Sequence, residues 1–238
     1  MVPTQNSFNS TITNATTITF DATNTIDINS YSTISIGNDD VDQNINIGTS
    51  GKRILAMGST NGAASLALRY GTGDMTLASA TGTVISALDT GEITMPLQPA
   101  FLAKRSSTVS SITGNGTIYI AIFDTEIYDQ SSDYNNTTAY FTAPVTGRHL
   151  FSCNITYGGA SSATRQYVEL YTSNRLYRRL AGYDNNGIYS LRWLSNHITH
   201  LVDMDAGDTA CVKIMADGAG SDNAQFLEHS YFSGKLIC

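Results

Sequence analysis

The sequence predicts an all-β protein in two parts: a repeating part over residues 1–98 and a globular part over residues 99–238. Two observations support this division. Only 14% of the 238 residues are charged, 41% are hydrophobic, and Thr, Ser, Asn and Gly are abundant, a balance typical of short strands joined by turns. Short apolar–polar–apolar segments also recur along the chain, with a regular period in the first part.

The first part contains an eight-residue repeat. The segments TITF, TIDI and TISI begin at residues 17, 25 and 33. Each reads as a short half-buried strand and is followed by small polar residues that form turns. The pattern loosens further along, for example at Met75-Thr76-Leu77. Such a period predicts stacked β repeats instead of a compact domain.

A single chain is poorly suited to hold this repeat together. Burying two apolar side chains per repeat gains less free energy than the conformational entropy lost in ordering eight backbone residues. A thin ribbon also leaves the backbone groups at its edges unpaired. Three chains wound together would bury the apolar stripes and close the edges. We therefore expect residues 1–98 to form a homotrimeric fibre shaft, similar in pattern to the shafts of phage tail fibres and other viral or bacterial fibres.

The joint between the two parts is expected at residues 91–99. This segment carries Pro96 and Pro99, which cannot donate backbone hydrogen bonds and suit a linker.

The most specific spacing in the sequence lies in residues 123–151. Six positions carry it: Phe123, Asp129, Tyr134, Phe141, Gly147 and Phe151. The spacing resembles the signature of the C1q and tumour necrosis factor superfamily. His149 and Cys153 depart from that signature, which usually has Tyr and an aromatic residue at these places.

Three shorter matches to the superfamily occur in the right order around this segment. They are Pro99-Ala100-Phe101, then Leu201 with Ala206-Gly207-Asp208 and Val212, and finally Phe232-Ser233-Gly234. The resemblance implies that residues 99–238 form a jelly-roll sandwich that assembles as a homotrimer. Many animal members carry a collagen stalk, whereas this chain has no Gly-x-y run. We therefore expect an extracellular protein of a virion, a phage tail fibre or a bacterial cell surface.

Local patterns within the head predict strands and core residues. Residues 118–123 are apolar on both faces, which predicts a strand covered on both sides. Val168 and Leu170 are expected in the core, with Glu169 facing solvent or a partner. The core interpretation also extends to four phenylalanines, because large aromatic residues dominate such interiors: Phe123, Phe141, Phe151 and Phe232.

Charge and cysteine content narrow the function. The net charge is −7, which argues against nucleic-acid binding, since that rests largely on neutralising phosphates. No run of about eighteen apolar residues occurs, so we expect no membrane-spanning segment. The three cysteines, Cys153, Cys211 and Cys238, lack a CxxC spacing. Buried free thiols are the default expectation, with a disulfide between Cys153 and Cys211 as the alternative.

Catalytic and metal motifs are scarce. The sequence has no GxSxG, HExxH or phosphate-binding Gly-Lys loop, so we predict that the protein is not an enzyme. His197 and His200 are interpreted as a solvated or structural pair. Asp203, Asp205 and Asp208 are most simply a tight turn around Gly207. They are also the candidate calcium ligands, because some members of the superfamily bind calcium near the trimer apex.

The leading hypothesis is a homotrimeric fibre whose head binds a receptor or a cell-surface glycan or protein, as an adhesin or receptor-binding tip. Loops carry most binding on rigid β scaffolds, so the candidate contact residues are Tyr183, Asp184, Asn185, Asn186, Arg192 and Trp193. Two alternatives stay open. The head is a trimerisation and folding clamp without a ligand, or the protein is a polysaccharide depolymerase, which needs paired carboxylates in a groove.

Overall fold

The computed structural model describes Ile36, Ile47, Leu66 and residues 68–159, 163–182, 193–218 and 224–238. The chain divides into two compact units, Met1–Ala67 and Leu68–Cys238. Apart from Ile36, the segments of the eight-residue repeat lie outside the described residues. The described residues form strands and turns, and none of them belongs to a helix long and apolar enough to cross a membrane.

A small antiparallel sheet precedes the head. It consists, in this order, of β1 (Met75–Ser79), β2 (Gly82–Ala87) and β3 (Ile93–Thr94). The strand expected at Met75-Thr76-Leu77 is confirmed as part of β1. Gly82 follows the tight turn between β1 and β2 with a φ of 137°, a conformation that only glycine adopts without strain.

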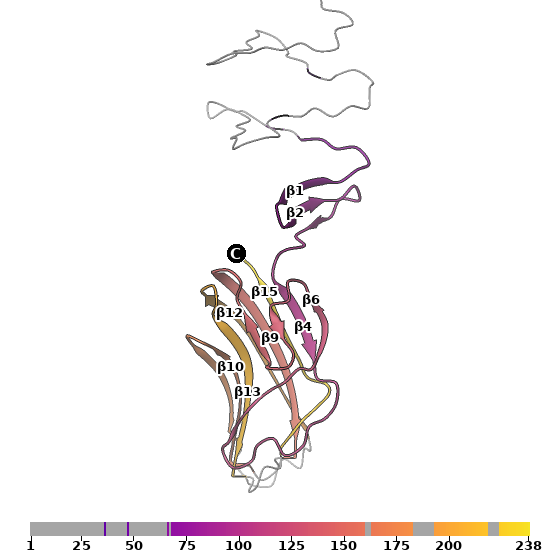
Figure 1. The fold of residues 1–238 in the computed structure, drawn as a ribbon. Coiled ribbons are helices and arrows are strands. Elements are labelled where there is room, and N and C mark those ends of the chain that lie inside the picture. The colour runs from indigo at the N-terminus through magenta and orange to yellow at the C-terminus, as the bar shows by residue number, and fades with distance from the viewer. Residues whose placement is uncertain are drawn as a thin grey trace, which may run out of the picture. The chain divides into compact units, whose positions relative to one another are not determined.

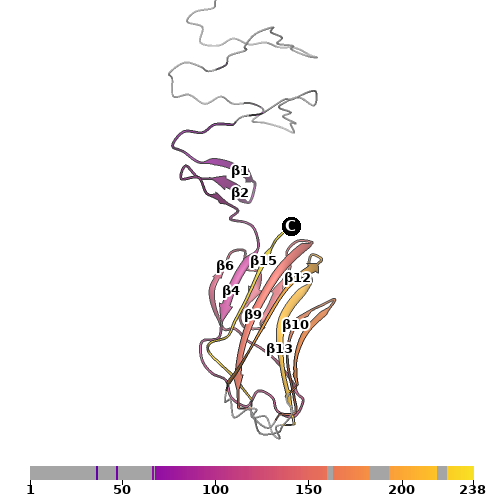
Figure 2. The ribbon, with the colours of Figure 1, turned by 180° about the vertical axis from the view of Figure 1, so that it is seen from behind.

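Two six-stranded antiparallel sheets form the head (Figures 1 and 2). The first, called the β13 sheet, has the order β11-β10-β13-β8-β7, and β5 also pairs with β13. Its strands are β5 (Ile118–Ile120), β7 (Tyr134–Asn135), β8 (Tyr140–Thr142), β10 (Arg165–Thr172), β11 (Leu176–Gly182) and β13 (Thr209–Asp217).

The second, called the β9 sheet, has the order β12-β9-β15-β4-β6, and β14 also pairs with β9. Its strands are β4 (Ala100–Lys104), β6 (Thr125–Asp129), β9 (Gly147–Gly158), β12 (Trp193–Met204), β14 (Gln225–Phe226) and β15 (Tyr231–Leu236). The two sheets face each other as the layers of a sandwich (Figure 1). The expected jelly-roll-like all-β head is thus confirmed.

Aromatic rings fill the space between the two sheets. Phe101 is the centre of this cluster, with its ring centroid 4.7 Å from that of Tyr134, 5.3 Å from Phe141 and 5.1 Å from Phe232. The four phenylalanines predicted as core residues are completely buried: Phe123, Phe141, Phe151 and Phe232. Their core interpretation is confirmed.

Two glycines allow backbone and rings to approach closely. A Cβ added to Gly147 would lie 2.6 Å from the carbonyl oxygen of Cys238 and 2.9 Å from Leu236. A Cβ added to Gly234 would lie 2.6 Å from the rings of Phe101 and Phe151. The signature glycine at position 147 therefore lets the last residues of the chain pass directly over the start of β9.

His149 and Cys153, the two departures from the superfamily signature, are both buried in the core. The imidazole of His149 stacks on Phe151, with 6.1 Å between ring centroids and 14° between ring planes. Its Nδ1 lies 3.3 Å from the carbonyl oxygen of Gly147. Because His149 takes the place of an aromatic ring and Cys153 packs as a small apolar side chain, the core closes without the usual residues.

Two expectations about the head strands are wrong. The strand predicted over residues 118–123 ends at Ile120, and Ile118 is 52% exposed because β5 pairs only with β13. Val168 and Leu170 are buried as expected, but Glu169 is also buried, at 3% exposure. Glu169 pairs with Lys213 of β13 and with Arg178 of β11 in the strand register, so its strand has a neighbouring strand on both sides.

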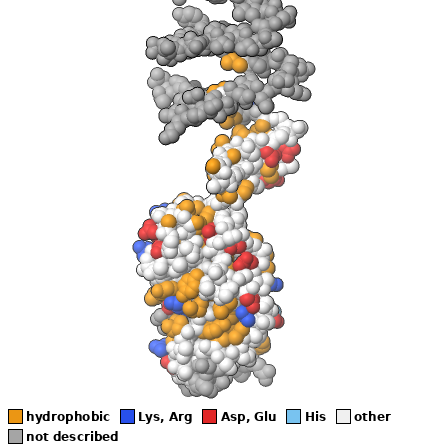
Figure 3. Space-filling model, in the orientation of Figure 1, with side chains coloured by type: hydrophobic (Ala, Val, Ile, Leu, Met, Phe, Trp, Pro, Cys, Tyr) orange, Lys and Arg blue, Asp and Glu red, His pale blue; other side chains and the backbone are white. Residues whose placement is uncertain are grey.

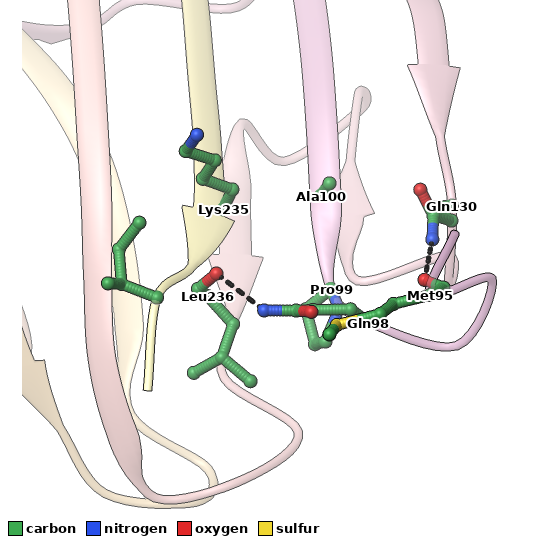
Figure 4. A pocket seen from close by; sticks show the side chains of 8 residues that line it. Met95, Gln98, Pro99, Ala100, Gln130, Lys235 and Leu236 are labelled. Carbon is green, nitrogen blue, oxygen red and sulfur yellow. Dashed lines mark hydrogen bonds between the residues drawn. The ribbon is translucent and has the colours of Figure 1, made fainter. Parts of the chain in front are cut away.

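The predicted joint is held to the head by two glutamine side chains (Figure 4). Gln98 Nε2 donates to the Leu236 carbonyl at 2.8 Å, and Gln130 Nε2 donates to the Met95 carbonyl at 2.7 Å. Together with Pro99, Ala100, Lys235 and Ile237, these residues line a shallow pocket of about 380 Å³. Residues 95–99 are therefore part of the surface of the head at the end where β4 begins.

Candidate binding face

One face of the β9 sheet is turned away from the aromatic core. Side chains alternate along β9, so that Phe151, Cys153 and Ile155 are buried in the core while Ser152 and Asn154 point outward. The outward residues of this sheet are called the outer face. They are Arg148, Leu150, Ser152, Asn154, Thr156, Trp193, Ser195, His197, Thr199, Leu201, Asp203, Tyr231, Ser233, Lys235, Ala100, Leu102, Lys104 and Tyr128.

The strand register arranges the outer face in rows. One row runs through Leu201, Leu150, Lys235 and Ala100. The next runs through Thr199, Ser152, Ser233, Leu102 and Tyr128, and a third through His197, Asn154, Tyr231 and Lys104. The first row lies nearest the joint, because Lys235 and Ala100 also line the pocket there.

Large apolar side chains on this face are open to solvent. Trp193 is 55%, Leu201 53% and Tyr128 50% exposed, while Leu150 and Leu102 are half-buried. Figure 3 shows, on the side of the head that it draws, hydrophobic side chains gathered across the middle with charged groups around them. An apolar surface of this kind with a polar surround is typical of a protein interaction site.

A cluster of hydroxyl and imidazole groups lies in the rows next to Leu201 and Leu150. Ser152 Oγ is 2.9 Å from His197 Nε2, and Thr199 Oγ1 is 3.1 Å from the same nitrogen. Thr199 Oγ1 also donates to Ser152 Oγ at 3.1 Å. The side chain of His197, interpreted from sequence as solvated or structural, is thus held by two hydroxyls on the outer face. These hydrogen bonds join side chains of the neighbouring strands β9 and β12 within one chain.

Trp193 is the one predicted contact residue that lies within the described part of the chain. It begins β12 opposite Gly158, at the end of the outer face farthest from the joint. Its ring is therefore available to a ligand in the isolated chain. The other predicted contact residues lie outside the described residues: Tyr183, Asp184, Asn185, Asn186 and Arg192.

The three predicted calcium ligands lie around the turn between β12 and β13. Asp208 accepts hydrogen bonds from Ser173 Oγ at 2.6 Å, Asn174 Nδ2 at 3.1 Å and the Asp205 amide at 2.9 Å. The bond from Ser173, and then the backbone bond from Asp205, lower the pKa of the Asp208 carboxyl. These bonds hold the turn, and among the described residues no group of three or more His, Cys, Asp or Glu is placed to hold a metal ion. Calcium binding stays a prediction.

The three cysteines are free thiols as expected, but the expectation that they are buried is confirmed only for Cys153 and Cys211. Cys153 and Cys211 are buried, and burial raises their pKa to about 12 and about 11 respectively. Cys238 is exposed, and its backbone carbonyl accepts a hydrogen bond from the Arg148 amide at 2.7 Å. The two buried thiols are therefore packing groups and not nucleophiles.

Sequence reasoning did not predict most of the outer face. Alternation in residues 193–204 gives a usable signal, since Ile198, Val202 and Met204 share one side while Ser195, His197 and Thr199 share the other. The rows themselves depend on the register between β12, β9 and β15, which joins residues as far apart as His149 and Leu236. No local pattern contains that information.

The head is similar to a known protein family and to several solved structures. Residues 100–237 match the family model described as the C1q domain. The globular domain of zebrafish complement 1qA is similar, with 19% identity and a TM-score of 0.44 over 59% of this chain and 98% of that chain.

Two further solved structures are similar to the chain. Murine APRIL at pH 8.5 has 12% identity and a TM-score of 0.41 over 59% of this chain and 99% of its own. The PRD1 vertex protein P5 has 8% identity and a TM-score of 0.42 over 72% and 86%. No curated protein sequence matches the chain.

Proposed function

The chain belongs to the C1q domain family, and from that premise we propose that it is a homotrimeric fibre protein whose head binds a receptor or a cell-surface glycan. Domains of this family are typically homotrimeric binding modules of secreted or extracellular proteins. We place this protein on a virion, a phage tail fibre or a bacterial cell surface, with residues 1–98 as the shaft and residues 99–238 as the head.

The exposed apolar side chains on the outer face of the β9 sheet are the observation that supports a homotrimer. Leu201 and Tyr128 expose about half of their surface in the single chain, beside Leu150 and Leu102. Two further copies packed around a threefold axis would cover this face. The cluster of Ser152, His197 and Thr199 would then lie within the covered face, where the hydrogen bonds among its own side chains keep these polar groups paired.

Binding would use the end of the head opposite the joint. Trp193 presents an exposed indole there, and aromatic rings offer a flat apolar surface with a polar N–H to a sugar or protein ligand. We propose that the predicted contact residues Tyr183, Asp184, Asn185, Asn186 and Arg192 complete the contact. Three weak identical sites on one tip gain avidity when the target presents repeated groups.

A second candidate is favoured by the joint. The bonds from Gln98 to Leu236 and from Gln130 to Met95 tie the preceding segment to the head, as a folding clamp for a shaft requires. In this function the head registers three chains and recognition occurs elsewhere. The two candidates share the homotrimer and differ only in whether the head has a ligand.

The homotrimer is tested by light scattering on purified protein of residues 1–238. We expect the mass of three chains. Leu201→Glu should shift the mass to that of one chain, because a carboxylate would be buried at the interface. Leu176→Glu is the matched control, since Leu176 is 54% exposed at the start of β11 in the other sheet. A monomeric unaltered chain would contradict the proposal.

Ligand binding is tested on intact bacterial cells and immobilised surface polysaccharides with labelled protein. We expect binding that Trp193→Ala weakens without changing the trimer mass. A trimer that binds none of these surfaces, and whose Trp193→Ala variant behaves identically, would favour the clamp.

A further inference from the structure

We propose that the small sheet of β1, β2 and β3 is a second trimerisation element, in which the apolar face of each copy packs against the same face of two further copies of this chain. The inference rests on the proposed homotrimer but concerns a part of the molecule outside the C1q domain.

The register separates apolar and polar side chains onto opposite faces of the small sheet. Met75 pairs with Ala87, Leu77 with Ile85, and Ala87 with Ile93. Because paired residues share a face, one face consists of Met75, Leu77, Ile85, Ala87 and Ile93, called the apolar face. The opposite face carries the paired residues Thr76, Ser86 and Thr94. Val84 has no partner in the register, because it lies at the irregularity between the pairs Leu77–Ile85 and Ala78–Thr83.

The single chain leaves this apolar face uncovered among the described residues. Leu77 is 57% and Ile93 68% exposed, and none of the five residues is buried. Ser86, on the polar face, is buried at 6% exposure. A three-stranded sheet gains stability when its apolar face packs against another layer, so this face is built for an occupant.

The occupant we infer is the same sheet of neighbouring copies, because the small sheet is tethered closely to the head. Gln130 holds the Met95 carbonyl on the head, and Ile93 precedes Met95 by only two residues. Two extended residues span about 7 Å. In a trimeric head the three tethers lie at one end by symmetry, so each small sheet meets the other two at high effective concentration.

The test uses protein of residues 1–238 with Cys238→Ser, which removes the exposed thiol and leaves Cys153 and Cys211 buried. Ile93→Cys places a thiol on the apolar face, and Thr94→Cys places one on the polar face as the matched control. A bismaleimide that spans about 10 Å, the spacing of packed sheets, is then added to each variant. Leu77→Cys and Thr76→Cys form a second pair, in case one substitution prevents folding.

We expect each variant to have the mass of a trimer before the reaction. After it, a denaturing gel should show covalent dimers for Ile93→Cys and Leu77→Cys but single chains for Thr94→Cys and Thr76→Cys. If the protein is a trimer in solution but Ile93→Cys and Leu77→Cys run as single chains on the gel, this inference is overturned and the proposed homotrimer is not. The apolar face would then be covered by residues 1–67 or by another protein. Monomers in solution would instead overturn the homotrimer itself.

Discussion

The head and the small sheet are built from similar strands, but they bury their apolar side chains differently. In the head, alternate residues of β4, β9 and β15 meet the β13 sheet of the same chain, and Phe101 contacts four other aromatic rings. In the small sheet, the side chains of Leu77 and Ile93 meet no second layer among the described residues. The head has two sheets from one chain, which cover each other, whereas the small sheet has no second sheet to pack against among the described residues.

This comparison separates what one chain folds alone from what requires several chains. A sandwich closes its core with two sheets from one chain, so we expect the head to keep its core in a monomer. A three-stranded sheet with one apolar face has no such partner. Its stability should therefore depend on assembly, which the following substitutions test.

The largest expected effect is in the closed core. Phe101→Ala removes the central ring and leaves a cavity, which should cost about 3–5 kcal/mol of unfolding free energy. Chemical denaturation followed by tryptophan fluorescence measures it. Leu77→Ala on the small sheet is the control and should leave the unfolding midpoint of the head unchanged. Equal losses from both substitutions would show that the two regions fold as one unit.

The next effect concerns the crossing of β9 by the end of the chain. Gly147→Ala places a Cβ 2.6 Å from the Cys238 carbonyl oxygen, so the last residues must move, at a cost of about 1–3 kcal/mol. Thermal unfolding of the head measures the loss. Gly73→Ala is the matched control before the small sheet, where an added Cβ meets no atom within 4 Å. A neutral Gly147→Ala would show that the chain end is loosely held.

Acid should weaken the head through His149. Its Nε2 is buried without a hydrogen-bond partner among the described residues, and burial lowers the pKa of this imidazole below 6.5. Below pH 6.5 the unfolded chain therefore binds the proton more readily. Stability falls with pH from there down to the folded pKa, by at most about 1.4 kcal/mol per pH unit. Denaturation at several pH values should show this slope, and His149→Phe should remove it.

Asp133 provides an internal comparison with the opposite sign. Burial, and then the neighbouring Asp129, raise the pKa of the Asp133 carboxyl from 3.8 to about 6. The folded state therefore takes up this proton first, and stability rises as pH falls from about 6 toward 3.8. Asp133→Asn should steepen the acid loss seen in the unaltered protein. An unchanged slope would mean that Asp133 is solvated in solution.

The smallest effect is expected where the two regions meet. Gln98→Ala removes the hydrogen bond to the Leu236 carbonyl, which is worth about 0.5–1.5 kcal/mol. Amide hydrogen exchange in residues 93–98 should become faster while the thermal midpoint of the head stays the same. Gln225→Ala, which removes a side-chain bond to Ser110 at the opposite end, is the control. Unchanged exchange at the joint would show that the segment is held by other contacts.

The head fold and its aromatic core could be predicted from the sequence. The spacing of Phe123, Tyr134, Phe141 and Phe151 resembles the superfamily signature, and that resemblance implied the jelly-roll sandwich. The outer face could not be predicted, because Leu201 and Leu150 become neighbours only through the register of β12 and β9. The contact residues Tyr183 to Asn186 stay a prediction.

The errors also have physical reasons. The apolar pattern around Ile118 predicted a strand covered on both sides. The exposure of a strand depends on its neighbouring strands, and β5 pairs with β13 alone among the described strands. Ile93 and Thr94 were expected in a linker because of Pro96 and Pro99, whereas they form β3. Prolines mark where pairing stops and do not exclude a strand just before them.

The first and last strands of the head begin and end at the same place. The Leu236 amide donates to the Pro99 carbonyl at 3.0 Å, and β4 and β15 pair along their length. A domain whose entry and exit are adjacent can be moved between proteins as a cassette, since a host chain needs only one attachment point. For the same reason, a circular permutant that joins these ends with a short linker should retain the sandwich, and recombination could exchange heads without altering the residues that precede them.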